Sequence, residues 1–258
     1  MASLEPRVRC GSGEVARRWQ RGTLSHTTAV LSKAKYWIAR PLGAKAYWYL
    51  MGRWKPVRAV TSGYDNVDEM LTSGNDVVAL LEKLDAFRAD SVTLHIGSGL
   101  GRVEYHLGLR VKRCYGVDIS ASMVKRARAL VPHDNVEFRA TDGDGLHGWP
   151  DEPLDLVYSF LVFQHLPRAR FAAYLRDAHA KLSAGGRLVF QMIVDENASA
   201  PDPPPSHPYG LRLYRRDDVE SRLRRVGFVG ITRWDLDGAA DDGSSSTGDI
   251  VFSASKAP

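Results

Sequence analysis

The chain has 258 residues, of which 44% are hydrophobic and 25% are charged, values typical of a globular protein with one large domain or one domain and an appended segment. Its two cysteines, Cys10 and Cys114, exclude a disulfide framework and a cysteine-rich zinc cluster. No stretch approaches the roughly 18 apolar residues of a membrane span, and the N-terminus lacks the apolar core of a secretion signal. We therefore expect a cytoplasmic protein without a membrane span.

Positive charge is concentrated in the first 60 residues, which carry +10, whereas the rest of the chain carries −5. Residues 24–54 place Tyr and Trp among Lys and Arg, a pattern that predicts one or two amphipathic helices, broken near Pro41 and Gly43. Four interpretations remain open: a helix packed on the core, a lid over a substrate pocket, a membrane-surface helix, or a nucleic-acid-binding face. We divide the chain into this N-terminal arm or lid, 1–60, and a main domain, 61–258.

The main domain alternates predicted helices and strands. Residues 66–87 have helical spacing, with a break between two helices expected at Ser73 and Gly74. Further helices are expected at 101–109, 120–130, 168–182 and 215–226. Strands are expected at 92–96, 113–117, 136–139, 154–159, 187–194, 228–236 and 249–255. This order predicts an α/β fold with a doubly wound, mostly parallel seven-stranded sheet and an antiparallel C-terminal hairpin.

A glycine-rich loop follows the first predicted strand and opens a helix. Gly97, Ser98, Gly99 and Gly101 form a G-x-G-x-G pattern, which lets the backbone approach a ligand closely beside the free N–H groups of a helix N-terminus. A dinucleotide fingerprint would be G-x-G-x-x-G, and Arg102 occupies its last glycine position. The loop alone indicates a ligand site without naming the ligand.

Two acidic residues follow the next two predicted strands. Asp118 lies 21 residues after Gly97, the distance at which an acid reaches the ribose hydroxyls of an adenosine-containing ligand. Asp142, followed by Gly143, is placed to accept a hydrogen bond from an adenine amino group. The simpler alternatives are an Asp118 that caps the next helix and an Asp142 that stabilises a turn.

The ordered set of motifs resembles the class I S-adenosylmethionine-dependent methyltransferases, in particular the bacterial small-molecule group with a Rossmann-like fold. The resemblance covers roughly residues 64–256. It rests on Gly97 to Gly101, the sequence from Val117 to Met123, Asp142, Asp155-Leu156-Val157, and the turn from Leu182 to Gly186.

This resemblance implies a role for each matching residue. The glycine loop would hold the methionine part of S-adenosylmethionine and of its product, S-adenosylhomocysteine, while Asp118 would hold the ribose. Ile119 and Met123 would pack against adenine, although an ordinary core role suits Met123 equally well. Asp142 and Gly143 would contact the adenine edge, and Phe160 would place its backbone near the sulfonium.

One position departs from the family pattern. Where the family has Asp or Glu two residues before the first glycine, this chain has His95. The family's acid helps to organise the cationic end of the cofactor, and a histidine supplies no negative charge. Either an acid from elsewhere in the chain compensates, or the cofactor pocket serves a non-methylating purpose.

The catalytic candidate is His165, which follows the fourth strand and can act as a general base for an oxygen or amine acceptor. The alternative is a histidine that fixes its loop. His207, Tyr209 and Tyr214, on or beside the Pro-rich loop 197–213, are candidates for substrate contact. No short metal-ligand spacing occurs, so we expect no metal.

The leading hypothesis is O-methylation of a small hydroxylated molecule, a saccharide or a natural product. The first alternative is an RNA or other anionic polymer as acceptor, which the basic arm favours but which no separate RNA-binding module supports. The second is a non-methylating, S-adenosylmethionine-binding protein with a lapsed active site, which His95 favours. A homodimer is left open.

Overall fold

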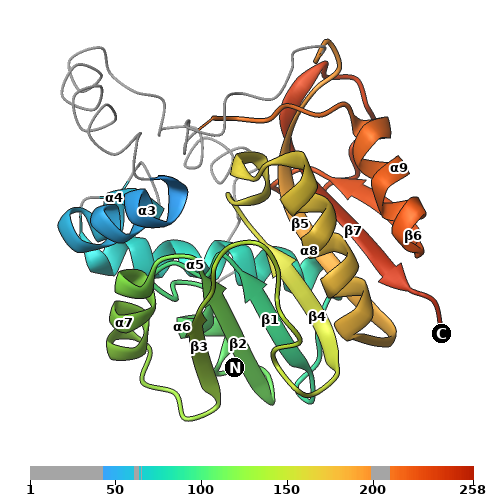
Figure 1. The fold of residues 1–258 in the computed structure, drawn as a ribbon. Helices are drawn as coiled ribbons and strands as arrows, with labels where there is room; N and C mark the ends of the chain where they lie inside the picture. The colour runs from blue at the N-terminus through green and yellow to red at the C-terminus, as the bar shows by residue number, and fades with distance from the viewer. Residues whose placement is uncertain (1–42, 61–63, 65, 199–209) are drawn as a thin grey trace, which may run out of the picture.

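The computed structural model describes residues 43–60, 64, 66–198 and 210–258. Within them, seven strands form one sheet in the order β3-β2-β1-β4-β5-β7-β6 (Figure 1). The strands are β1 (Val92–Ile96), β2 (Arg113–Asp118), β3 (Val136–Ala140), β4 (Leu154–Ser159), β5 (Leu182–Asp195), β6 (Phe228–Trp234) and β7 (Thr247–Lys256). The first five run parallel, and β7 pairs antiparallel with both β5 and β6. The predicted fold class, with its antiparallel C-terminal hairpin, is confirmed.

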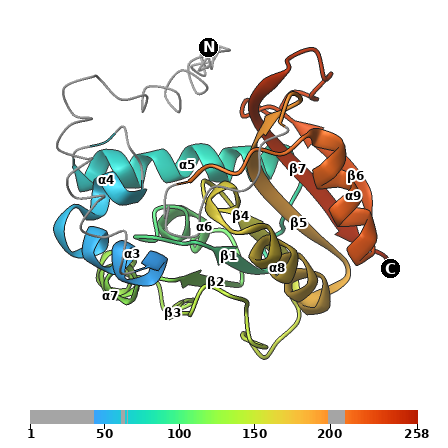
Figure 2. The ribbon, with the colours of Figure 1, turned by 45° about the horizontal axis from the view of Figure 1, so that its top comes forward.

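Helices cover both faces of the sheet (Figures 1 and 2). They are α3 (Gly43–Trp54), α4 (Pro56–Val60), α5 (Val67–Lys83), α6 (Glu104–Leu107), α7 (Ala121–Leu130), α8 (Arg168–Lys181) and α9 (Arg216–Val226), with a 3-10 turn η2 (Phe163–His165). Strand β5 shows the two-sided packing: Phe190 lies in the core under α8 and α9, and its neighbour Val189 lies in the core under α5 and α6. Alternate side chains of a strand point to opposite faces, so a sheet covered on both sides needs apolar residues at every position.

The parallel strands bring the three loops that follow β1, β2 and β4 to one edge of the sheet. All five residues of β1 are buried, and β1 lies between β2 and β4. The register pairs His95 with Gly116 on one side and with Tyr158 on the other, so β1, β2 and β4 end at about the same level. Open α/β sheets bind their ligands at this carboxyl edge.

The break predicted at Ser73 and Gly74 is wrong, because α5 continues through both residues. The Ser73 hydroxyl donates to the Met70 carbonyl within the helix at 2.6 Å, which makes the serine compatible with a helical interior. A Cβ on Gly74 would overlap the Arg102 carbonyl. The glycine therefore lets the helix approach the chain that follows the glycine loop, and it does not interrupt the helix.

Two other boundaries differ from those predicted. The helix expected over 101–109 has only four helical residues, α6, because turns occupy the positions on both sides. The turn expected at Gly185 and Gly186 lies inside a strand, since β5 begins at Leu182 directly after α8. Ser120 is the N-cap of α7, and its hydroxyl accepts from the Met123 amide.

Part of the predicted N-terminal arm is described. Helix α3 packs on α7, where the hydroxyls of Ser120 and Ser122 donate to the carbonyls of Trp48 and Tyr49 at 3.0 and 2.7 Å. Residues 1–42, which hold the rest of the arm, lie outside the described part of the chain. None of the described helices has the length and apolar character needed to cross a membrane.

Candidate functional site

A cavity of about 360 Å³ lies at the carboxyl edge of the sheet. Its volume is in the range of small-molecule sites. One half is lined by the glycine loop and by the ends of β2 and β3, and the other by the loop after β4, the start of α8 and Arg212. Residues of α3, including Trp48, border the cavity as well.

The glycine loop has the conformation that a ligand cradle needs. Gly97, Gly99 and Gly101 all have positive φ angles, of 83°, 56° and 77°, which side chains strongly disfavour. A Cβ on Gly97 would overlap the Val162 side chain, and one on Gly101 would lie 2.8 Å from the Phe138 ring. The loop is therefore held close to its neighbours, with its backbone along the cavity wall.

Asp118 joins the glycine loop to the second strand. Its Oδ2 accepts from the Gly99 amide at 2.9 Å and its Oδ1 accepts from the Ser120 amide at 2.8 Å. Burial raises the pKa of the Asp118 carboxyl, although both backbone hydrogen bonds act to lower it. Each carboxylate oxygen keeps acceptor capacity beyond these bonds, and the residue lines the cavity. The carboxylate is therefore fixed in place with capacity for two hydroxyl donors.

The remaining residues expected to hold the cofactor divide into two groups. Ile119, Met123, Gly143 and Phe160 line the cavity, and Met123 also belongs to a small buried cluster, so its position is compatible with both suggested roles. Asp142 does not line it: the side chain is 70% exposed and pairs with Lys45 of α3. The structure thus places the neighbours of Asp142 at the cavity and its carboxylate outside.

His165 ends the η2 turn and lines the opposite half of the cavity. Burial, followed by the charge of Arg212, lowers the pKa of His165 to about 4, so its imidazole is neutral at physiological pH. The Arg212 guanidinium donates to the His165 carbonyl at 2.7 Å, and its own amide donates to Gln164 at 2.8 Å. Sequence reasoning missed Arg212, because nothing in an irregular segment identifies a buried arginine.

The structure describes one of the three substrate candidates on or beside the Pro-rich segment. His207 and Tyr209 lie outside the described residues. Tyr214 is fully buried in the core between Phe171 and the guanidinium of Arg168, which lies 4.3 Å from its ring centroid, and it does not line the cavity. An isolated β-bridge pairs Tyr214 with Val194 of β5. The assignment of Tyr214 to substrate contact is therefore corrected to a core role.

An acid from elsewhere in the chain does meet His95. Glu104 of α6 is completely buried, and its Oε1 lies 2.6 Å from Nδ1 of His95. His95 itself lines the cavity beside Gly97. The sequence indicated that a compensating acid was needed but not which one, because the two residues are nine positions apart across a loop.

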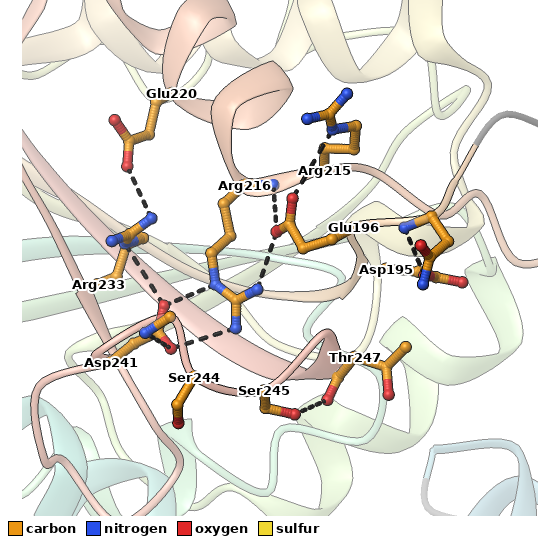
Figure 3. A network of polar contacts seen from close by, with 12 residues as sticks. Asp195, Glu196, Arg215, Arg216, Glu220, Arg233, Asp241, Ser244, Ser245 and Thr247 are labelled. Atoms are coloured by element: carbon orange, nitrogen blue, oxygen red, sulfur yellow. Dashed lines mark hydrogen bonds and ion pairs between the residues drawn. The ribbon is translucent and has the colours of Figure 1, made fainter.

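A network of ion pairs holds the base of the Pro-rich segment (Figure 3). Glu196, before the undescribed stretch, accepts from Arg216 after it at 2.8 Å, and Arg216 also donates to Asp241 at 2.7 Å. Glu196 is thus engaged by arginine. No group of three or more His, Cys, Asp or Glu side chains suited to a metal occurs in the part of the chain that the structure describes.

Comparisons with known proteins agree with this geometry. Residues 94–190 match the family model described as a methyltransferase domain. An uncharacterized methyltransferase from Geobacillus kaustophilus is 33% identical over 131 residues, and one from Geobacillus thermodenitrificans is 32% identical over 129; each match covers 50% of this chain and 57% of the relative. The chain thus spans little more than half the length of these curated relatives.

Solved structures share the fold. The [4+2]-cyclase SpnF superposes with a TM-score of 0.61 at 15% identity over 83% of this chain and 96% of that chain. The CcbJ methyltransferase from Streptomyces caelestis gives 0.58 at 19% over 72% and 90%, and DhpI in complex with S-adenosylhomocysteine gives 0.55 at 22% over 82% and 98%. These likenesses show a shared fold, and residues 94–190, the part that matches the methyltransferase domain model, lie within it.

Proposed function

We propose that the protein transfers a methyl group from S-adenosylmethionine to a hydroxyl of a small molecule, a saccharide or a natural product. The observation that carries the proposal is the two-sided cavity, with the glycine loop and Asp118 on one side and the neutral imidazole of His165 on the other. When bound, S-adenosylmethionine supplies a sulfonium methyl group and is converted to S-adenosylhomocysteine.

The residues of the first half fit this cofactor. The glycine loop brings its backbone close to the methionine end, and Asp118 has two oxygens for the ribose hydroxyls. Ile119, Met123 and Gly143 offer apolar and backbone surface for the adenine, and Phe160 lines the cavity as well. Much of the work of methyl transfer is the orientation of two reactants, which a preformed cavity supplies.

The second half suits a hydroxyl acceptor. Among the described residues that line the cavity, Asp118 is the only carboxylate, whereas Arg102, Arg170 and Arg212 are cations. This charge balance disfavours a protonated amine as acceptor. His165 is placed to accept the proton that an acceptor hydroxyl releases, and Trp48 offers a ring on which a sugar face can pack.

The experiment combines cofactor binding with an acceptor screen. We expect S-adenosylhomocysteine to bind in calorimetry, and we expect mass spectrometry to find methyl ethers in a panel of sugars and hydroxylated natural products. His165→Gln is expected to lower kcat about 10²-fold with unchanged cofactor affinity, at the lower end of general-base effects because its pKa is far below neutrality.

A second candidate function is a non-methylating reaction in the same pocket, since the fold is shared with the [4+2]-cyclase SpnF. It predicts cofactor binding without formation of S-adenosylhomocysteine on any acceptor. Methylation of RNA or of amines in preference to hydroxyls would also overturn the proposal, whereas absence of binding would overturn the cofactor assignment itself.

A further inference from the structure

The buried pair of His95 and Glu104 lies beside the glycine loop, in the half of the cavity assigned to the cofactor (the cofactor half, as opposed to the acceptor half around His165). Only 4% of the His95 side chain and none of the Glu104 side chain is exposed. Glu104 Oε1 lies 2.6 Å from His95 Nδ1 and also accepts from the Tyr158 hydroxyl at 2.9 Å. The Tyr158 ring stacks on the imidazole with centroids 4.4 Å apart. The imidazole plane is thus fixed by one hydrogen bond and one stacking contact.

The partners of Glu104 determine which nitrogen of His95 carries the proton. Burial and the charge of Glu104 raise the pKa of Tyr158 well above its ordinary value, so its hydroxyl stays protonated and donates. A carboxylate only accepts hydrogen bonds, and therefore Nδ1 of His95 must be the donor to Oε1. In the neutral imidazole the second nitrogen, Nε2, is then an acceptor.

That second nitrogen has no hydrogen-bond partner among the residues that the structure describes, although it is buried. A buried acceptor without a partner is costly, and such groups mark places where a ligand supplies the missing donor. His95 lines the cavity together with Gly97 and Ser98, where the methionine end of the cofactor would lie under the proposed function.

We propose that Nε2 of His95 accepts a hydrogen bond from the α-ammonium group of the cofactor's methionine, with Glu104 supplying the negative charge. The inference rests on the proposed cofactor. S-adenosylhomocysteine offers three kinds of donor: the ribose hydroxyls, the adenine amino group and the ammonium. Asp118 is assigned to the ribose under the proposed function, and Thr141 and Gly143 line the cavity where the adenine would lie, so the ammonium is the donor left for His95.

The pair reproduces the charge of a carboxylate at position 95 only while His95 is neutral. Protonation of His95 turns Nε2 into a donor and cancels the charge of Glu104, which removes the site for a cation. The charged or titratable groups around it are Glu104 on α6, Tyr158 on β4, Asp118 at the end of β2 and Arg102 in the glycine loop. With a neutral imidazole, the pair therefore presents one acceptor and one negative charge to a cation.

The test is calorimetric titration of the full chain at about pH 7, where the ligand ammonium is charged. The two probes are S-adenosylhomocysteine and 5′-methylthioadenosine, which lacks the amino-acid end. For the wild type we expect S-adenosylhomocysteine to bind about tenfold more tightly, because only this probe offers the ammonium. The ratio of the two affinities isolates the amino-acid end, since both probes present the same ribose and adenine.

Variants separate the role of the pair from general damage. His95→Asp should keep the affinity for S-adenosylhomocysteine, because it restores a carboxylate at this position. Glu104→Gln should weaken S-adenosylhomocysteine about tenfold and leave 5′-methylthioadenosine unchanged. His147→Gln, at an exposed histidine outside the cavity, is the matched control and should leave both affinities unchanged.

A measurement on the wild type does not depend on the variants folding. Nitrogen NMR of labelled histidine should show the Nδ1–H tautomer of His95 and a change at Nε2 when S-adenosylhomocysteine binds, but no such change with 5′-methylthioadenosine. If S-adenosylhomocysteine binds with an unaltered Nε2 and Glu104→Gln leaves the ratio of the two affinities unchanged, the inference is wrong and the cofactor assignment stands. If neither probe binds, the proposed function fails as well.

Discussion

The two halves of the cavity are built in different ways. The cofactor half is made from the ends of adjacent parallel strands, with the Gly99 amide of the glycine loop fixed on the Asp118 carboxylate. The acceptor half is made from the side chains of His165, Arg170 and Arg212, which come from a 3-10 turn, a helix start and an irregular segment. A site built on sheet register is constrained by the fold itself, whereas a site built on loops varies independently of it.

The sharpest test of this contrast is Asp118→Ala. Loss of two charge-assisted hydrogen bonds to the ribose, each contributing about 2 kcal/mol, is expected to weaken S-adenosylhomocysteine about 10³-fold in calorimetry. Asp155→Ala is the matched control, since Asp155 also accepts from a backbone amide, that of Val92 at 2.8 Å, but lies outside the cavity lining. Equal losses in both variants would show that the effect of Asp118 is structural.

The burial of His165 in the acceptor half should make the free energy of unfolding depend on pH in the acidic range. The pKa of His165 is lowered from an ordinary 6.5 to about 4, first by burial and then by Arg212. Between these two values the unfolded chain binds a proton that the folded chain does not, so the free energy of unfolding falls as the pH falls from 6.5 toward 4, by about 3 kcal/mol in all. Urea unfolding at several pH values measures this slope, and His165→Gln should reduce it.

The control is His147→Gln. The hydrogen bond from His147 to Asp144 raises the pKa of this exposed histidine, so its contribution to stability is present at low pH and is lost as the pH rises. Removing it should not reduce the slope. A wild-type slope that His165→Gln leaves intact would mean that His165 is solvated and charges freely.

The same contrast explains what could be predicted from the sequence. Gly97, Gly99 and Asp118 follow predicted strands, and parallel strands end at a common edge, so strand prediction alone brings these residues together. Glu104 and Arg212 give no such signal, because the burial of a charged side chain depends on partners that are distant in sequence. The break predicted in α5 failed for a related reason: the role of Gly74 as a packing contact is visible only once its neighbour is placed.

The ion-pair network of Glu196, Arg216 and Asp241 is the next test. Arg216 and Asp241 have side chains only 4% and 7% exposed, and Asp241→Asn removes one charge of this buried pair. Because Arg216 keeps Glu196, we expect a loss of about 2 kcal/mol in urea unfolding, below the usual cost of a wholly unpaired buried charge. A rise in KM for the acceptor with unchanged cofactor affinity should accompany it.

Glu82→Gln is the control for the ion-pair network. Glu82 pairs with Arg110 at the surface, with side chains 47% and 37% exposed, and its removal should change stability by less than about 1 kcal/mol. A weakened affinity for S-adenosylhomocysteine in Asp241→Asn would contradict the division into two halves, since it would couple this ion-pair network to the cofactor half of the cavity.

The smallest effect is expected at Asp142, which the sequence places on the adenine edge and the structure places in an exposed pair with Lys45. Exposed ion pairs contribute little, so Asp142→Ala should change stability by less than about 0.5 kcal/mol and S-adenosylhomocysteine affinity by less than about threefold. Lys45→Met breaks the same pair from the α3 side and should match it. A tenfold loss of affinity in Asp142→Ala, without one in Lys45→Met, would show that the carboxylate turns inward to the adenine when the ligand binds. The cofactor half would then depend on one mobile side chain, and its contrast with the acceptor half would be one of degree.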